Sequence, residues 1–540
     1  MKNIVKQLIF AFTLLLSVAA CDVERLPETQ LSDPAFWKTE ADLQSAANYL
    51  YTFLPGLPFT NDNWSDETYE RAPNGISDGT RIATATDGNY NTPYLLIRAA
   101  NNIIEKAPRA AANGVAAATV DRYIAEARFF RAWAYYGLLQ RYGGVPLILK
   151  LLQEDSAELQ APANTRDEII EAIYQDLDFA AAKLQTPTQL GTAGYGRISK
   201  TTAWAFKSRV ALFEGTRAKF HSYGDFKKHL TLAATAAKLV IDSKEHSLFA
   251  NYYNMFQMSG EGRQNRENIL VKQYGVSIAD NVLTHNSARN LENGSASPTK
   301  SLVDSYLMTD GLPTTKSKLY KTPVVSTDVF VNRDERLSAT IMKTGDAYIG
   351  SAPVFSIAPL VFQFTGFCSR KYFNIDDWTN QRSYIDGILI RYAEVLLNYA
   401  EAQFELNETI TDADLELSVN LLRTRGKIAK LTNAFVTTNG LTMRDEIRRE
   451  RRVELAVEGF RYWDLIRWKT AETELVKPIL GNYFFKTEFG TATTVKLTAD
   501  NYILVQDASF RKFNPAKDYL WPLPVNEIGL NPALKQNPGW

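Results

Sequence analysis

The sequence predicts a mostly α-helical protein, with about four tetratricopeptide-like helix pairs packed beside an irregular, loop-rich region that contains short strands. Long blocks carry apolar residues three and four positions apart, which is the period of a helix. These blocks follow one another in pairs, rich in alanine with aromatic residues between, so neighbouring helices can approach closely. Two stretches, 56–89 and 252–383, lack this period. An ordinary helical bundle is the alternative, because the strict repeat pattern is not legible.

The N-terminus has the features of an export signal. Residues 1–20 combine two lysines with an apolar run, Leu8 to Ala20, that is short for a membrane span. Cys21 directly follows the small residues of "SVAAC", and this placement resembles the lipobox of bacterial lipoproteins, whose cysteine becomes the lipidated first residue. Residues 21–36, which are polar and contain two prolines, would then form a lipidated tether. A plain signal peptide with an incidental cysteine is the alternative.

The helix pairs are expected near 40–110, 121–186, 198–242 and 387–428. In the second pair, the block that begins at Asp121 has apolar residues on opposite faces, so we expect that helix to be packed on both sides. Gly143 and Gly144 end it, and Thr165 caps the next helix. The two irregular stretches contain turn residues and strand-like runs, such as "ENILVKQYGV" and "PLVFQFTGF". Long loops inside a compact domain are usually functional or ordered by their own packing, and the ligand site is expected in these stretches and not on the helices.

The stretch "RRERRVELAVEGFRYWDLIRW", residues 448–468, interleaves basic and acidic residues. Glu450, Glu454 and Glu458 are four apart and therefore share one stripe of a helix, which Arg451 and Arg461 bracket. A neighbouring cation lowers the pKa of a carboxyl group, so these glutamates would be poor general acids. Arginines that are already paired would also bind phosphate poorly. We therefore predict a partly buried wall of paired charges between helices.

Composition excludes several functions. Without the two lysines of residues 1–20, 58 basic residues face 60 acidic ones, so the chain lacks the basic excess of a general nucleic-acid binder. After residue 20 no apolar run is long enough for a membrane helix. The metalloprotease, P-loop, serine-hydrolase and paired C-x-x-C motifs are missing. A glycosidase needs only two carboxylates at no fixed spacing, and the adjacent acids at 66–67 and 376–377 are the pairs to inspect.

The irregular stretches contain aromatic residues among polar ones, which suits a glycan site. Sugar rings stack their flat C–H faces on exposed aromatic rings, while amides and charged groups bind the hydroxyls. Loop packing is the alternative role for each tryptophan. Acid-rich loops could also supply oxygen ligands to a structural calcium ion, but no EF-hand spacing is present, and no cofactor is predicted. The candidate ligand residues are Trp64, Tyr69, Tyr90, Trp378, Asn63, Asp66, Arg71, Asn374 and Asp377.

Several segments together resemble the SusD/RagB family, the nutrient-binding outer-membrane lipoproteins of Bacteroidetes. The stretch at 448–468 resembles the family's C-terminal signature, and "YLWPLPVNEIGLNPALKQNPGW" resembles its C-terminal ending. "EARFFRAWAYYGLLQRYGGVPLI", "GRISKTTAWAFKSRVALFEG" and "RYAEVLLNYAEAQFEL" are similar to family helices. The matches follow the family's order over most of the mature chain. The resemblance implies one SusD-like domain at 37–540, with its C-terminal signature at 441–540.

The resemblance also implies a function and a partner. The chain is expected to be a non-enzymatic lipoprotein, anchored in the outer membrane by its lipid and facing the cell exterior. It would bind an oligosaccharide or polysaccharide and deliver it to a SusC-like TonB-dependent transporter. Because some relatives take up peptides, peptide capture is the runner-up. A surface glycoside hydrolase and a helical scaffold that serves only assembly are the further alternatives.

Overall fold

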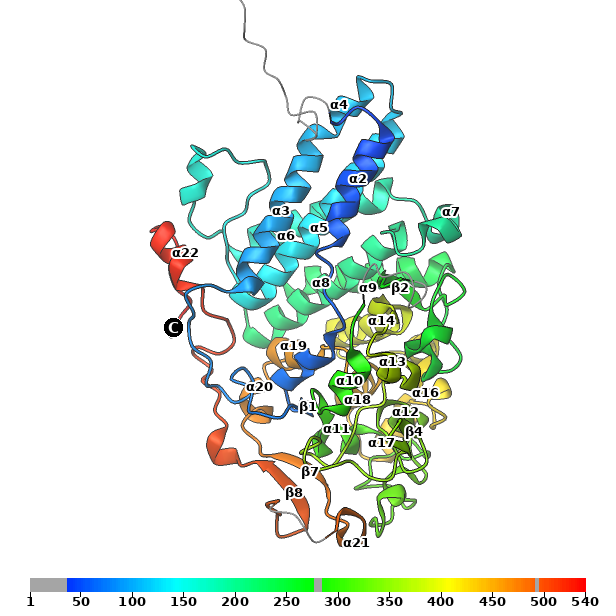
Figure 1. The fold of residues 1–540 in the computed structure, drawn as a ribbon. Helices are drawn as coiled ribbons and strands as arrows, with labels where there is room; N and C mark the ends of the chain where they lie inside the picture. Colours follow the sequence, from blue (N-terminus) through cyan, green and yellow to red (C-terminus); the bar gives the residue numbers. More distant parts are fainter. Residues whose placement is uncertain (1–35, 276–283, 491–494) are drawn as a thin grey trace, which may run out of the picture.

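The computed structural model describes residues 36–275, 284–490 and 495–540. Long helices pack side by side in one part of this region, and short helices and two-stranded sheets fill the other (Figure 1). In the helical part α5 packs against both α3 and α6, α8 against α9, and α14 against α9. The long helices are α2 (Glu40–Tyr51), α3 (Gly88–Lys106), α5 (Ala117–Tyr142), α6 (Arg166–Lys183), α8 (Lys200–His221), α9 (Phe226–Ser243), α14 (Tyr392–Asn407) and α18 (Met443–Glu454).

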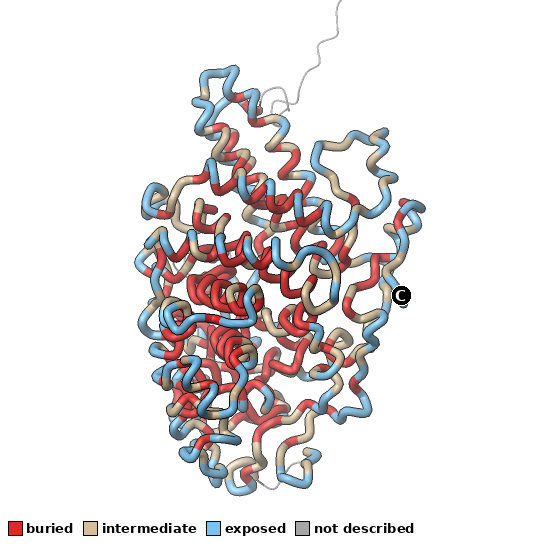
Figure 2. The backbone as a smooth tube through the Cα atoms, turned by 180° about the vertical axis from the view of Figure 1, so that it is seen from behind, coloured by how far each residue is buried: buried red, intermediate tan, exposed pale blue. Residues whose placement is uncertain are grey.

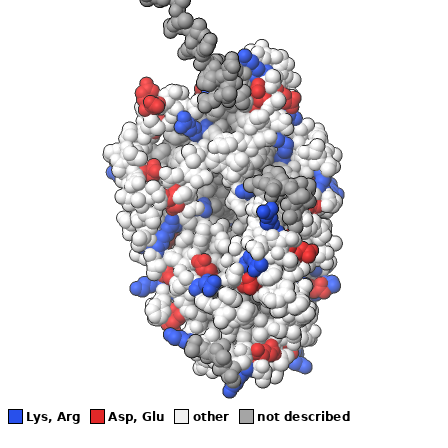
Figure 3. Space-filling view, viewed as in Figure 1, with Lys and Arg blue, Asp and Glu red and all other residues white. Residues whose placement is uncertain are grey.

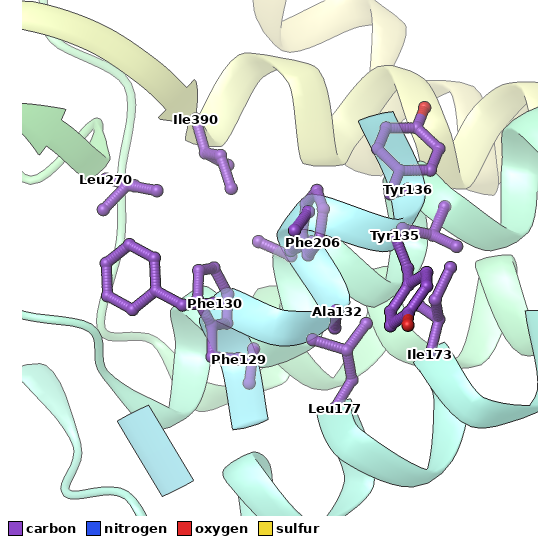
Figure 4. Packing of buried hydrophobic residues seen from close by; sticks show 14 of the residues in the cluster. Phe129, Phe130, Ala132, Tyr135, Tyr136, Ile173, Leu177, Phe206, Leu270 and Ile390 are labelled. Atoms are coloured by element: carbon purple, nitrogen blue, oxygen red, sulfur yellow. The ribbon is translucent and has the colours of Figure 1, made fainter. Parts of the chain in front are cut away.

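The starts and ends of these helices follow local chemistry. Thr165 accepts a hydrogen bond from the backbone of Glu168, whose side chain accepts one from Thr165 N in return, which forms a capping box at the start of α6. α5 ends at Gly143, which has φ +74°. Side chains on all faces of α5 are buried, which confirms that it is packed on both sides. Figure 4 shows Phe129 and Phe130 of α5 beside Phe206 of α8 in this core.

The irregular part has a hydrophobic core of its own. Strands β2 (Asn268–Lys272) and β6 (Gly387–Arg391) pair antiparallel and join the two parts, because Leu270 and Ile390 face the helical core (Figure 4). "ENILVKQYGV" therefore contains a strand as expected. "PLVFQFTGF" forms turns instead, because Gly366 has φ +73° and the buried Gln363 amide donates to the carbonyl groups of Leu291 and Glu292.

Short elements complete the architecture. Three further antiparallel pairs are β1 (Thr68–Tyr69) with β3 (Ser297–Pro298), β4 (Ala347–Ile349) with β5 (Ala352–Val354), and β7 (Ile479–Tyr483) with β8 (Tyr502–Gln506). The short helices include α4 (Pro108–Ala111), α7 (Pro187–Leu190), α10 (Ser287–Glu292), α11 (Lys300–Ser305), α12 (Glu335–Thr340), α13 (Ile375–Asn380), α15 (Asp412–Leu417), α16 (Val419–Arg425), α17 (Asn433–Thr438), α19 (Arg461–Arg467), α20 (Ala471–Glu474), α21 (Lys486–Phe489) and α22 (Val525–Leu530).

The C-terminal segment returns to the helical part. Trp521 N donates to Arg141 O at 2.7 Å, and the Asn537 amide donates to Tyr142 O at 3.0 Å, so the segment is bound to the end of α5. Figure 2 shows buried backbone along the inner helices and exposed backbone on loops at the rim. α22 lies on that rim, beside the first turns of α3 (Figure 1).

Candidate functional site

The charged stretch at 448–468 is a buried ion-pair network. The carboxylates of Glu454 and Glu458 are at most 5% exposed. Arg391, at the end of β6, donates to Glu454 at 2.5 Å and to Glu458 at 2.6 Å. Lys371 donates to Glu458 at 2.6 Å. The predicted wall of buried, paired charges is thus confirmed.

The bracketing arginines have other partners than predicted. Arg451 pairs with Asp464 at 2.9 Å and Arg461 with Asp66 at 2.8 Å, so neither pairs with the glutamate stripe. The chain turns back at Gly459, which has φ +80°, and this turn places α19 beside α18. The stripe is instead neutralised by cations from segments far away in the sequence.

These carboxyl groups cannot act as general acids at neutral pH. Burial alone would raise the pKa of Glu454, but the guanidinium groups of Arg425, Arg391 and Arg336 overcome that effect and hold the pKa well below its usual range. Glu454 is therefore ionised throughout the physiological range. The network holds helices together and offers no proton for catalysis.

The two adjacent-acid pairs do not form facing, free carboxylates either. Asp66 is bound by Arg461. Burial raises the pKa of Glu67 to about 7, but the same burial keeps this carboxyl group away from a ligand. In the second pair, Asp377 accepts from the Ser383 hydroxyl at 2.5 Å, whereas Asp376 is exposed. Hydrolysis of a glycosidic bond needs two accessible carboxyl groups that face each other across the bond. Neither pair of adjacent acids meets this requirement.

Trp64 lies in a cluster of aromatic rings. Its ring meets the edges or faces of Tyr462 at 6.0 Å, Trp463 at 6.3 Å and Trp521 at 5.4 Å. The guanidinium of Arg141 lies over the rings of Trp463 and Trp521, 5.1 and 5.0 Å from their centroids. Trp64 therefore has the packing role that was the alternative at this position.

The polar neighbours of Trp64 are mostly buried, which corrects the expectation that they flank an open platform. Asn63 is 3% exposed and donates to Ser295 O at 2.7 Å, and Asp66 is held by Arg461. Tyr69 is half-buried in β1. Arg71 is exposed and lies over the Phe362 ring. The structure thus separates these residues instead of gathering them around one ligand.

Trp378, on α13, is partly exposed but one face of its ring is covered. The Arg289 guanidinium lies 3.7 Å from the ring centroid and also donates to Trp378 O at 3.2 Å. Asn374 caps α13 by accepting from two backbone amides, and Asp377 is 3% exposed. The burial of Asp377 corrects its expected place on an open rim. Trp378 is partly exposed and stays a candidate ligand residue.

Tyr90 borders a long groove, although the side chain itself is 3% exposed. The rings of Tyr94 and Tyr142 each lie 5.2 Å from it, so it cannot offer an open face. Tyr94, one helical turn later, is partly exposed and carries the accessible ring. The sequence did contain this signal, because residues four apart lie on one face of a helix.

We call this depression the α3 groove, and its volume is about 810 Å³. Volumes between roughly 300 and 1,000 Å³ are typical of small-ligand sites. Its walls are α3, the segment 146–160 and the C-terminal α22. It is lined by Tyr90, Asn91, Tyr94, Leu95, Ile97, Arg98, Asn101, Pro146, Ile148, Lys150, Leu152, Gln153, Glu154, Glu158, Leu159, Gln160, Glu527, Leu530, Asn531 and Leu534.

Hydrogen bonds from behind hold the floor of the α3 groove in place. The Tyr94 hydroxyl donates to Pro146 O at 2.9 Å, which fixes the ring. Asn101 donates to the carbonyl groups of Ile148 and Lys150, and its own carbonyl accepts from Arg131 at 2.8 Å. Because these bonds lie within the protein, they fix the positions of the lining side chains and preorganise the groove.

The rim of the α3 groove is polar. Asn91 donates to Glu527 at 2.9 Å and so connects α3 to α22. Arg98 is exposed and has no ion-pair partner in the described part of the chain. Together with Gln153 and Gln160, these side chains provide donors and acceptors around an aromatic ring, the combination that sugar binding needs.

Charges elsewhere are mixed. Figure 3 shows basic and acidic side chains interspersed over one face, as the balanced composition predicts. Within residues 36–275, 284–490 and 495–540, no group of three or more His, Cys, Asp or Glu is placed to hold a metal ion. The same residues contain no helix long and apolar enough to span a bilayer. Cys21 lies outside the described residues.

Comparisons with known proteins identify relatives over the full length. Residues 248–540 match the profile of the SusD family, and residues 43–212 match a profile described as starch-binding, associating with the outer membrane. A SusD-like protein of Bacteroides ovatus is 25% identical, covering 99% of this chain and 97% of the relative. SusD-like protein P38 of Formosa agariphila is 26% identical, covering 98% and 99%.

Solved structures share the fold. A SusD-like carbohydrate-binding protein of Bacteroides fragilis is 26% identical with a TM-score of 0.77, covering 93% of this chain and all of that one. Surface glycan-binding protein A of Bacteroides fluxus shares the fold with a TM-score of 0.64 at 22% identity, covering 93% and 100%. The SusD profile alone matches more than half of the 540 residues, and the chain therefore belongs to the SusD family of non-catalytic binding proteins.

Proposed function

We propose that this protein is a cell-surface lipoprotein that captures an oligosaccharide in the α3 groove and delivers it unaltered to a TonB-dependent transporter in the outer membrane. The observation that carries the site assignment is the fixed, partly exposed Tyr94 ring in a groove of about 810 Å³. Membership of a family with glycan-binding relatives supports the class of ligand.

The groove suits a sugar chain in both chemistry and shape. An aromatic ring can stack on the C–H face of a pyranose, while Asn91, Arg98 and Gln153 reach the hydroxyls. Binding of this kind needs no proton transfer by a side chain, so the ligand would be captured without a reaction.

A lipid anchor at Cys21 would hold the protein at the membrane surface. If Cys21 is lipidated, about fifteen residues connect the lipid to Phe36, and an extended chain of that length spans at most about 50 Å. Residues 37–540 would act as one SusD-like domain, and the N-terminal end of α2 would face the membrane. The transporter partner rests on the family resemblance.

A peptide is the second candidate ligand. Leu95, Leu159 and Leu530 are 59%, 48% and 72% exposed around the α3 groove, and apolar side chains of a peptide could pack against them. The same rim contains the polar groups that suit a sugar, so ligand screening must include both glycans and peptides.

The test uses the protein truncated after Cys21 and a polysaccharide panel, read by affinity electrophoresis and then calorimetry. Tyr94→Ala should weaken binding of the positive glycan by about fivefold, since stacking on a ring contributes on the order of 1 kcal/mol. Phe510→Ala is the control, because Phe510 is 66% exposed and does not line the groove. Product formation would indicate a hydrolase, and binding of peptides alone would overturn the sugar assignment.

Two further variants test whether the ligand binds at Trp378 or Trp64, the tryptophans that the sequence suggested, and not in the α3 groove. If Trp378→Ala abolishes binding and Tyr94→Ala does not, the ligand lies at α13 and the α3 groove is excluded. Trp64→Ala should act only through stability, because its ring packs on Trp463 and Trp521. Isolation of the full-length lipoprotein from native outer membranes tests the partner, and a co-purifying TonB-dependent barrel is the expected result.

A further inference from the structure

A second, smaller cavity lies on the other side of the helical part. Its volume is about 240 Å³, and it lies between α7, the turn at 194–199, the end of α9 and β2. In Figure 1 α7 and α22 are on opposite sides of the molecule, so this cavity is separate from the α3 groove. The volume is below that of sites for drug-sized ligands, about 300–1,000 Å³, and it suits one sugar ring.

Arg263 lines this cavity without a partner. The side chain is half-buried, and it has neither a hydrogen bond nor an ion pair within residues 36–275, 284–490 and 495–540. A guanidinium group has five N–H donors, and withdrawing them from water without a partner is costly. Arg391 and Arg336, by contrast, each have carboxylate partners. Arg263 is therefore available to a ligand.

The remaining charges leave the cavity net positive. Arg266 also lines it, and its guanidinium donates only to the carbonyl groups of Lys244 and Glu245. The Glu245 carboxylate accepts from the hydroxyl of Thr188 at 2.7 Å. One acidic side chain thus faces two cationic ones, and the cation at position 197 is already paired with a glutamate.

His246 adds no charge to this cavity. Its Nδ1 donates to Arg266 O at 3.0 Å, so Nε2 accepts from the Thr201 hydroxyl at 2.8 Å. Burial, together with the charges of Arg266 and Arg263, lowers the pKa of His246 to about 4. The imidazole is therefore neutral at the pH of most environments, and the arginines alone attract an anion.

A buried acceptor accompanies these donors. The Asn268 amide nitrogen donates to the Tyr195 hydroxyl and to Gly260 O, both at 3.3 Å. Its carbonyl oxygen Oδ1 is buried and has no hydrogen-bond partner in the described structure. An unsatisfied buried acceptor costs about 1–3 kcal/mol, which a ligand hydroxyl would recover. The cavity therefore combines a free cation with a free acceptor.

We propose that this cavity is a second binding site, which holds one hexuronate residue of an acidic glycan. The carboxylate would pair with the Arg263 guanidinium, and a ring hydroxyl would donate to Asn268 Oδ1. A neutral sugar would leave the cation unpaired, and a simple oxyanion would leave the acceptor unpaired. The proposal is independent of the α3 groove and extends the protein's ligands to charged glycans.

The test titrates glucuronate into the protein truncated after Cys21, with glucose and inorganic sulfate as comparison ligands. Binding is measured by calorimetry and by ligand-observed NMR. Glucuronate should bind, glucose should not, and sulfate should bind more weakly. Arg263→Gln should weaken glucuronate binding by about tenfold or more, the loss expected for one charge-assisted contact. Arg263→Lys should retain part of it, because lysine keeps the charge without the planar fork.

The control is Lys227→Gln, which removes the same charge from an exposed position at the start of α9. It should bind glucuronate as the parent does. Tyr94→Ala should also leave glucuronate binding unchanged. The proposal for this cavity and the proposal for the α3 groove can therefore fail independently of each other. The proposal is overturned if Arg263→Gln binds like the parent, if glucuronate does not bind at 10 mM, or if sulfate binds as tightly as glucuronate.

Discussion

The ion-pair network around α18 and the rim of the α3 groove are both rich in polar side chains, and they use them in opposite ways. Around α18, buried carboxylates such as Glu454 accept from several guanidinium groups at 2.5–2.8 Å. On the rim, exposed groups such as Arg98 have spare hydrogen-bonding capacity. Polar groups satisfied internally fix the fold, and polar groups left for solvent are available to ligand.

The largest effect that tests this comparison is expected from Arg391→Met. The substitution leaves Glu454 and Glu458 buried with fewer cations, and breaking a buried pair in this way costs about 3–5 kcal/mol. Denaturant unfolding of the truncated protein should show this loss. The residual folded protein should still bind glycan. A loss below about 1 kcal/mol would contradict the structural role assigned to the network.

Acid should remove part of the same stabilisation through Glu401. Burial alone would raise the pKa of Glu401, but Arg467 lowers it to about 2, below the usual 4.5. A carboxyl group with a lowered folded-state pKa stabilises the fold above pH 4.5, and this contribution is lost as pH falls toward 2. The stability difference between the parent and Glu401→Gln should therefore shrink by roughly 3 kcal/mol over that interval. A pH-independent difference would show that the carboxylate is not ionised in the folded state.

The smallest effect on stability is expected on the rim. Arg98→Gln should change the free energy of unfolding by no more than about 0.5 kcal/mol, as for other exposed positions. If the α3 groove binds glycan, the same change should reduce affinity severalfold, because a hydrogen bond from a charged group is lost. Lys227→Gln is the matched control on another surface. Equal affinities of the parent and Arg98→Gln would remove Arg98 from the site.

The helices could be predicted from the sequence because their signals are local. The Thr165 cap, the Gly143 stop and the alanine–aromatic pattern each act within a few residues. The burial and charge pairing of residues 448–468 were also predictable from the interleaved basic and acidic residues. Its partners were not, because Arg336 and Arg391 come from segments more than sixty residues away.

The candidate site was harder to predict because it is assembled from distant segments. The α3 groove brings Tyr94 together with Leu159 and Leu530, which no local pattern connects. The sequence predicted a ligand residue at Tyr90, but tertiary packing by Tyr142 covers that ring and leaves Tyr94 accessible. Asn63 and Asp66 look like loop residues in sequence, but long-range contacts with Ser295 and Arg461 bury them.

The return of the C-terminal segment to α5 has a consequence for biosynthesis. One wall of the groove is α22, and the contacts of Trp521 and Asn537 with the end of α5 hold that wall in position. Ribosomes make the N-terminal helices first, so a nascent chain contains α3 and α5 well before α22 can complete the α3 groove. Proteolysis just before Val525 would remove α22, and with it one wall of the α3 groove, while Trp521 would keep its place in the helical core.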